Sequence, residues 1–405
     1  MTVNYRKDRI LAKASELRPG DIDRLNKILD DAGLGRPLRH PENGASAASV
    51  SDLAVLPVVG ADPMAVRDAV RAFIGQGGAE LPTLFPDYKH NAGTVEDGAR
   101  ATKLFDASGK KSGHGTIAWL PAPDYEMPAP QPWQRRPDRR PVIALLDSGV
   151  QPHYWLPGAA DGQKFVLDAA NKYRWPAPKL DADVPANYGS HWGHATFIAG
   201  LIRLAAPDAQ VLSMKVMDST GKVNESDVVQ ALNWLADPPG TDFNVDLVLM
   251  AFGRPADPGD PDLANLRVPI QKLSHRKVRI VASAGNDGSE HPVYPAAFAA
   301  ETSLSVVSVG ALASATERAP YSNSGPWVRE WRNGTNIISI SPLTAKDIGK
   351  DRLTARTTFG PYTVSATGNG YAWWSGTSFA AAIYAGELAK QMSAGRALPE
   401  PAAGP

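Results

Sequence analysis

Apolar runs of strand length alternate with amphipathic stretches through the larger, C-terminal part of the chain. The apolar runs predict five strands, at residues 142–146, 211–216, 247–250, 279–282 and 305–309. Helical periodicity predicts helices at residues 196–204, 226–235 and 263–275. Strands that alternate with helices form parallel sheets through right-handed crossovers. We therefore expect an α/β domain in which helices cover both faces of a mostly parallel sheet.

The first 120 residues carry a separate pattern. Residues 21–33 place an apolar stripe along one face of a predicted helix, and Pro63 opens a second predicted helix. Strands are predicted at residues 53–59 and 116–120. The second helix has an apolar face made of Val66, Val70, Phe73 and Ile74. We expect a smaller α+β domain over residues 1–120.

Proline recurs through residues 121–140, which favours an extended linker over a helix. The α/β domain then covers residues 141–393. Glycine, alanine and proline dominate residues 394–405, so we expect a disordered tail there. Between residues 325 and 371 we expect a long surface hairpin, followed by Trp373 and Trp374, which we expect to pack beneath the next loop.

Composition excludes several classes of function. The 405 residues include 42 Lys plus Arg and 42 Asp plus Glu, so the net charge near zero argues against a nucleic acid or an anionic membrane as partner. Cysteine is absent, which excludes disulfides, thiol catalysis and cysteine-bound metals. The acidic loops match no metal-ligand pattern, and no glycine-rich phosphate loop is present. We expect neither a metal nor a cofactor.

The N-terminus has charged residues but no apolar core of signal-peptide length, and no run of about 18 apolar residues follows. These features predict a cytoplasmic protein. The alternative is a secreted protein whose signal peptide is missing from the sequence.

Candidate chemistry begins at Ser378, where Gly376 and Thr377 lead into an apolar, alanine-rich helical segment. The N-terminus of a helix favours negative charge on a reacting oxygen, so Ser378 is a candidate nucleophile. The alternative is a hydroxyl that caps an ordinary core helix.

Two further residues support the nucleophile. Asp147 ends a predicted buried strand, and His194 begins an apolar helical segment. A serine hydroxyl needs a base, and the base needs an orienting acid, so acyl transfer requires these three residue types together. His191 is the rival base.

These segments resemble the subtilisin (S8) family of serine proteases over roughly residues 141–392. The resemblance implies an Asp147, His194 and Ser378 triad, with Asn286 as the oxyanion-hole donor. It also implies a set of substrate-binding positions: Ala251, Phe252, Gly253, Arg254, Ala284, Gly285 and Val293.

The chain departs from the family pattern beside these groups. Ala195 follows the histidine where the family usually has glycine, and Phe379 follows the serine where it usually has methionine. Arg254 stands at a position where the family commonly has glycine. The reacting groups are unchanged, whereas the substrate-binding segment differs from the usual one. Because Val293 stands where a smaller residue is common, we expect cleavage after small or medium apolar residues.

The resemblance implies a serine endopeptidase with protein or peptide substrates. Its N-terminal domain would be propeptide-like or a docking module for a regulatory protein. We expect the linker, or the segment just before it, to lie in or near the substrate cleft, with any cleavage between about Trp119 and Arg140. The alternative is a partner-gated or catalytically silent protease fold that binds another protein.

Overall fold

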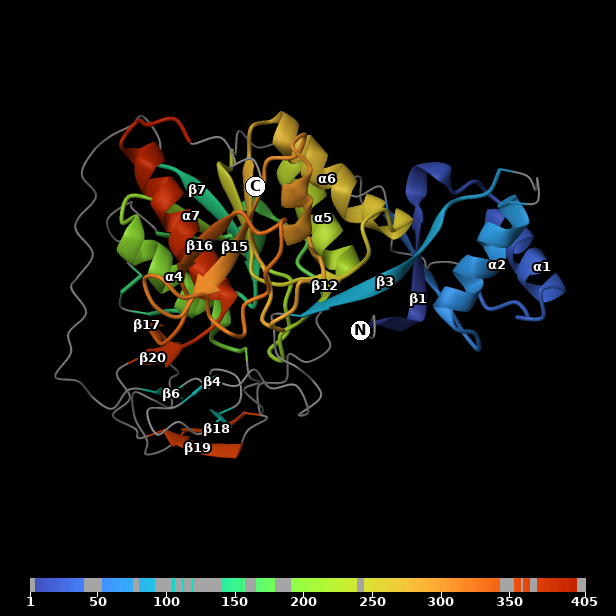
Figure 1. Cartoon of the computed structure of the whole chain (residues 1–405). Helices are drawn as coiled ribbons and strands as arrows, with labels where there is room; N and C mark the ends of the chain where they lie inside the picture. The colour runs from blue at the N-terminus through green and yellow to red at the C-terminus, as the bar shows by residue number, and fades with distance from the viewer. Residues whose placement is uncertain are drawn as a thin grey trace. The chain divides into compact units, whose positions relative to one another are not determined.

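The computed structural model (Figure 1) describes residues 4–39, 53–75, 80–91, 104–105, 111–112, 118–119, 140–153, 155–156, 165–178, 191–238, 244–342, 353–357, 360–364 and 370–398. The chain divides into two compact units. Unit 1 comprises Met1–His90, Asn224–Thr241 and Gly259–Pro269, and unit 2 comprises the rest. The expected linker lies outside the described residues except for Arg140, and the expected tail lies outside them except for residues 394–398.

A seven-stranded sheet forms the centre of unit 2, in the order β16-β15-β13-β11-β7-β9-β8. All six neighbouring pairs are parallel. Its strands are β7 (Val142–Asp147), β8 (Val166–Asp168), β9 (Gln210–Lys215), β11 (Leu247–Met250), β13 (Arg279–Ser283), β15 (Val306–Leu312) and β16 (Glu330–Asn333). Every residue of β7, β11 and β13 is buried, as in a parallel sheet covered on both faces. The expected α/β class is confirmed.

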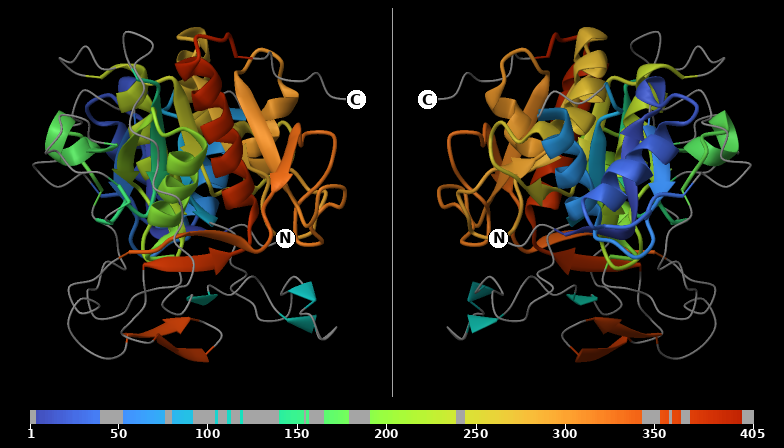
Figure 2. Two further views of the ribbon diagram at one scale, coloured as in Figure 1. Left: turned by 90° about the vertical axis from the view of Figure 1, so that its left-hand side faces the viewer. Right: turned by 90° about the vertical axis from the view of Figure 1, so that its right-hand side faces the viewer.

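Two long helices, α4 (His194–Ala205) and α7 (Thr377–Ser393), lie side by side on one face of this sheet (Figure 2). A Cβ atom on Gly386 of α7 would lie 2.6 Å from the Cβ of Ala205, so glycine permits the close approach of the two helices. Their apolar side chains join those of the strands in one large core. Unit 2 also contains the short helices α3 (Ala169–Tyr173) and η4 (Ala296–Ala300).

Small antiparallel sheets complete the described strands of unit 2. β20 (Tyr371–Trp374) pairs with β17 (Ile337–Ile340) on one side and with β6 (Ala118–Trp119) on the other. β12 (Arg254–Pro255) pairs with β14 (Val293–Tyr294). The expected surface hairpin corresponds to β18 (Leu353–Thr357) and β19 (Gly360–Val364), while β4 (Leu104–Phe105) pairs with β5 (Lys111–Ser112).

Unit 1 has β1 (Tyr5–Lys13) between β2 (Leu53–Pro57) and β3 (Leu84–Asn91), both antiparallel to it. Its N-terminal helices are η1 (Ala14–Glu16), α1 (Asp21–Asp31) and α2 (Pro63–Gly75). Val66 and Val70 of α2 enter the core as predicted. Phe73 and Ile74 do not, because they are 36% and 39% exposed on the last turn of the helix. The predicted apolar face was therefore too long.

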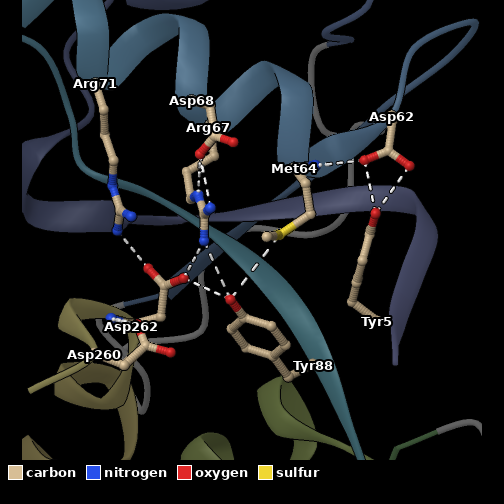
Figure 3. A network of polar contacts seen from close by, with 9 residues as sticks. All are labelled: Tyr5, Asp62, Met64, Arg67, Asp68, Arg71, Tyr88, Asp260 and Asp262. Carbon is tan, nitrogen blue, oxygen red and sulfur yellow. Dashed lines mark hydrogen bonds and ion pairs between the residues drawn. The ribbon is translucent and has the colours of Figure 1, made fainter. Parts of the chain in front are cut away.

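The later segments of unit 1 supply α5 (Glu225–Ala236), η3 (Pro261–Leu263) and the start of α6 (Ala264–His275), just after β10 (Lys222–Asn224). Polar contacts join these segments to the N-terminal part of the unit. The buried carboxylate of Asp262 accepts hydrogen bonds from Arg67 and Arg71 of α2 and from Tyr88 of β3 (Figure 3). Two cations and a hydroxyl thus compensate a charge that would be costly to bury alone.

A second set of contacts lies at the first turn of α5. Asp87 of β3 accepts hydrogen bonds from the backbone N–H of Ser226 at 3.0 Å and from its hydroxyl at 3.0 Å. Arg9 of β1 donates to the same carboxylate at 2.6 Å. Nearby, His90 Nε2 and Glu225 Oε2 are 3.1 Å apart, and both side chains are fully buried. Asp87 therefore acts as a helix cap from a distant part of the sequence.

Candidate active site

Three neighbouring parallel strands deliver the central groups of the site from their carboxyl ends. β7 ends at Asp147, β11 is followed by Ala251, and β13 is followed by Ala284 and Asn286. Because these strands are adjacent and parallel, the segments that follow them meet at one edge of the sheet. The sequence therefore brings together groups that lie far apart along the chain.

Asp147 and His194 form a buried hydrogen-bonded pair. His194 Nδ1 lies 3.0 and 2.9 Å from the two carboxylate oxygens of Asp147, and the backbone N–H of Ser148 donates to the same carboxylate at 2.7 Å. The residues are 0% and 1% exposed. An ionised carboxylate beside Nδ1 favours the tautomer with a proton on that atom. Nε2 is then left as the basic nitrogen.

Ser378 is the second residue of α7, and it is 2% exposed. Its hydroxyl donates a hydrogen bond to the backbone carbonyl of Ala251 at 3.2 Å. The next residue, Phe379, has its ring centroid 5.6 Å from that of His194, so the start of α7 lies against the imidazole. The helix N-terminus places partial positive charge at the serine.

Asn286 is held in a defined orientation by Thr377. Its Oδ1 accepts a hydrogen bond from the backbone N–H of Thr377 at 2.8 Å and another from the Thr377 hydroxyl at 2.8 Å. Because both are donors, they fix which end of the amide is the oxygen. A Cβ atom built on Gly376 would lie 3.4 Å from Nδ2, so the amide nitrogen lies beside the nucleophile loop. An amide nitrogen placed there can donate to a developing oxyanion.

The sequence-predicted substrate-binding positions form two backbone segments with Val293 between them. A Cβ atom on Gly253 would lie 2.5 Å from Val293 Cγ1, and one on Gly285 would lie 3.7 Å from Val293 Cγ2. The structure therefore gathers the four remaining positions around these glycines: Ala251, Phe252, Arg254 and Ala284. All four are buried, with exposed fractions of 2% or less. Their roles in substrate binding stay predictions.

A match to a family profile identifies the protein family of this chain. The profile described as the subtilase family matches residues 138–400. The chain belongs to the subtilase family. Expectations about the fold and the family are therefore confirmed, whereas the roles of individual residues stay predictions.

Named relatives agree with this subtilase assignment. The minor extracellular protease Epr of Bacillus subtilis (strain 168) is 30% identical over 207 residues, which are 49% of this chain and 27% of Epr. Subtilisin E of the same strain is 26% identical over 213 residues, or 49% of this chain and 48% of that protein. The chain thus spans about half or less of the length of these two relatives.

A solved structure extends the likeness beyond the subtilase profile. Fervidolysin from Fervidobacterium pennivorans, a keratinolytic enzyme related to subtilisin, matches with a TM-score of 0.57 at 18% identity. The match covers 98% of this chain and 56% of the fervidolysin chain. At this identity the likeness shows the fold alone.

Sequence reasoning missed Asn323, which organises the loop that carries Asn286 in this subtilase. Its Nδ2 donates to the carbonyl of Ala284 at 3.0 Å, and its Oδ1 accepts from the N–H groups of Asp287 and Ser289. Gly285, at φ +100°, passes so close that a Cβ would lie 2.5 Å from Asn323 Nδ2. No local signal identifies this asparagine, because its partners lie more than 30 residues earlier.

Tyr321 was missed as well. Its hydroxyl donates to the carbonyl of Gly334 at 2.7 Å, and the N–H of Gly376 donates to the same carbonyl at 2.8 Å. Burial raises the pKa of Tyr321 to about 12, so the phenol keeps its proton and stays a donor. Tyr321 and Gly376 therefore share one anchor, which fixes the backbone that leads into the nucleophile.

Aromatic rings surround His194. Trp374, His191 and Phe379 have ring centroids 5.3, 5.3 and 5.6 Å from that of His194. Trp374 packs beside the nucleophile loop as expected, whereas the side chain of Trp373 lies outside the described residues. His191 contacts the ring of His194, and it is His194 that carries the hydrogen bond to Asp147.

Among the side chains that the structure describes, no group of three or more His, Cys, Asp or Glu is arranged to hold a metal ion. Nor does the described part of the chain contain a helix of the length and hydropathy needed to cross a membrane.

Proposed function

We propose that this subtilase is a serine endopeptidase. The observation that carries the proposal is the buried hydrogen bond between Asp147 and His194, next to the helix N-terminus that bears Ser378. In the proposed reaction the Ser378 hydroxyl attacks a peptide carbonyl, and His194 Nε2 accepts its proton and returns it to the leaving amine. Asp147 orients the imidazole and stabilises the imidazolium that forms.

The oxyanion would be held by Asn286 Nδ2 and the backbone N–H of Ser378. This role is supported by the two Thr377 hydrogen bonds that direct the amide oxygen of Asn286 away from the reacting carbonyl. The Ser378 hydroxyl, which bonds the Ala251 carbonyl, must rotate toward His194 before it attacks. This rotation takes place about χ1, the single side-chain torsion of serine.

The proposal predicts that a fluorophosphonate probe labels Ser378 in the purified chain, because the probe reacts with an activated serine. Labelling and peptide hydrolysis should both disappear in Ser378→Ala and fall strongly in His194→Ala. Labelling that appears only after a partner protein is added would instead support the partner-gated alternative. No labelling under either condition would support the silent one.

For substrate preference, we propose small or medium apolar residues before the scissile bond. Support comes from Val293, whose methyl groups occupy the space between Gly253 and Gly285. Cleavage of a peptide library, read by mass spectrometry, measures this preference, and efficient cleavage after Phe or Tyr would contradict it. We further propose that Phe252 and Arg254 shape neighbouring subsites, so that Arg254→Gly alters specificity without loss of turnover.

For localisation, we propose that the protein acts outside the cell. Support comes from the relative Epr, which is named as an extracellular protease. The cytoplasmic expectation from the sequence has no such support. Fractionation of the native host, followed by immunoblotting of the medium and the cell lysate, separates the two locations.

We propose that the N-terminal region regulates the protease in the manner of a propeptide. One supporting observation is that unit 1 joins this region to α5 and η3 through buried charges such as Asp87 and Asp262. Another is that β6, just before the linker, pairs with β20, which ends four residues before Ser378. β6 therefore pairs with the strand that leads into the nucleophile loop. The alternative is a docking module for another protein.

A further inference from the structure

Asp147 alone does not fix the imidazole of His194. The hydrogen bonds at 2.9 and 3.0 Å reach only Nδ1, which is one edge of the ring. The rotation about the terminal bond of a histidine side chain has a broad energy profile, so the remaining edges need contacts of their own. In this chain, those contacts are aromatic.

Trp374 makes the most oriented of these contacts. Its ring lies 5.3 Å from that of His194 at an interplanar angle of 82°, which is an edge-to-face arrangement. Aromatic pairs favour this geometry because the positive edge of one ring meets the negative face of the other. The indole is 9% exposed, so it also keeps water away from that side of the imidazole.

The same indole contacts the two helices that carry the proposed base and nucleophile. On α4 it meets Phe197, one turn after His194, at 5.8 Å and 84°. On α7 it meets Phe379, directly after Ser378, at 5.1 Å. Trp374 is itself held by the pairing of β20 with β17, in which it lies opposite Ile337. The indole therefore lies where it can set the distance between α4 and α7 at the reacting groups.

His191 supports the indole from another side. Its ring is 5.7 Å from that of Trp374 and 5.3 Å from that of His194, and it is 2% exposed. Its backbone N–H donates to the carbonyl of Ser219 at 2.9 Å. Gly221, at φ +89°, leaves room for the ring, since a Cβ there would lie 2.7 Å from His191 Nδ1.

We infer that Trp374 is a positioning residue for the protease reaction, which holds the His194 imidazole in line between Asp147 and Ser378 while His191 supports the indole. The inference rests on the proposed role of His194 as general base. It assigns no contact with substrate to Trp374. Loss of the indole should therefore lower turnover and leave substrate binding nearly unchanged.

The test compares Trp374→Leu with Trp374→Phe. Leucine keeps an apolar side chain but loses the aromatic edge, so kcat should fall about 10- to 100-fold, as misplacement of a catalytic group by about 1 Å does. KM should stay within about 2-fold of the wild-type value, because Trp374 is assigned no contact with the substrate. Phenylalanine restores an aromatic ring and should recover kcat to within about 3-fold of the wild type. His191→Ala should lower kcat as well, because the indole loses the ring that packs on it.

A spectroscopic readout separates positioning from general loss of packing. The proton on His194 Nδ1 that faces the Asp147 carboxylate should give a low-field NMR resonance in the wild type. This resonance should broaden or vanish in Trp374→Leu and persist in Trp374→Phe. Trp155→Leu is the matched control. Its indole is also buried and packs edge-to-face, at 6.3 Å and 88°, but on Tyr371. That variant should lose thermal stability while it keeps both kcat and the resonance.

Several outcomes would overturn the inference. The inference fails if Trp374→Leu keeps the wild-type kcat and resonance. It also fails if Trp374→Leu and Trp155→Leu lose the same stability and show the same fall in kcat. Failure of the proposed function looks different, because the wild type itself would then neither hydrolyse peptides nor react with the fluorophosphonate. The resonance still tests the positioning role in that case, since it reports on the imidazole without turnover.

Discussion

At the scale of single residues, the site depends on side chains whose partners fix their orientation. Thr377 illustrates this, because it precedes the proposed nucleophile and also directs the amide of Asn286. The sequence indicated Asp147, His194 and Ser378 because each lies at the end of an apolar element. It could not indicate Asn323 or the role of Trp374, because their contacts come from distant segments and leave no local periodicity.

The orientation of Asn286 leads to a graded prediction. Asn286→Ala should lower kcat about 100- to 1000-fold, the usual effect of losing one oxyanion donor, with little change in KM. Thr377→Val keeps the backbone N–H but removes one of the two donors to Oδ1, so its loss should be smaller. Steady-state kinetics on a peptide substrate measure both. The oxyanion role of Asn286 would be contradicted if both variants lost the same factor in kcat, or if only KM rose.

His153 predicts how stability depends on pH. Its Nε2 is 3.1 Å from the carbonyl of Gly370, and its Nδ1 accepts from the N–H of Trp155 at 3.0 Å. Burial lowers the pKa of His153 to about 4, from an ordinary value near 6.5. Above pH 6.5 the ring is neutral in both the folded and the unfolded chain, so its contribution to the stability of the folded state is fully present. Between pH 6.5 and 4 the unfolded chain binds a proton that the folded chain does not, so stability falls.

The free energy of unfolding should fall by on the order of 2 kcal/mol between pH 7 and pH 4 because of His153. Thermal unfolding in a pH series measures it when the wild type is compared with His153→Gln, which does not titrate in this range. The difference between the two curves should narrow toward acid pH. Parallel curves would show that His153 titrates normally.

At the scale of elements, the sequence predicts where strands form better than it predicts which strands pair. The five predicted strands correspond to β7, β9, β11, β13 and β15, because long buried runs carry a clear signal. β8 was not predicted, since three residues are too few to show periodicity. The strand predicted at 116–120 exists as β6, but it pairs with β20 in unit 2. Sequence periodicity shows that a strand forms, whereas its partner depends on the whole fold.

The capping of α5 by Asp87 gives a prediction at this scale. Asn224, the residue before the helix, makes no side-chain cap, and Asp87 bonds Ser226 instead. Asp87→Ala should destabilise the first turn of α5 by about 1–3 kcal/mol, because a cap is lost and Arg9 loses its buried partner. Hydrogen exchange at the amides of residues 225–228 measures this in the full chain. Asp23→Ala, which removes an exposed carboxylate of α1, should leave exchange at α5 unchanged.

At the scale of the whole molecule, an endopeptidase with a preformed site needs protection from itself. The first 90 residues belong to a unit that also contains α5 and η3, and β6 joins the strand that precedes the nucleophile loop. Such connections suit an N-terminal region that is made with the protease and later released. The residues between β6 and Arg140 lie outside the described part of the chain, so cleavage there is a prediction from the sequence.

We expect the purified wild type to be cut between about Trp119 and Arg140 and the Ser378→Ala variant to stay intact, because only the wild type can process itself. Intact-mass spectrometry of both proteins measures this. Residues 1–120, made separately and added to the processed enzyme, should then inhibit peptide hydrolysis. Asp262→Ala in the enzyme should weaken that inhibition, since Arg67, Arg71 and Tyr88 would lose their common acceptor. An uncut wild type whose activity is unaffected by the added N-terminal region would assign that region to docking or substrate delivery instead.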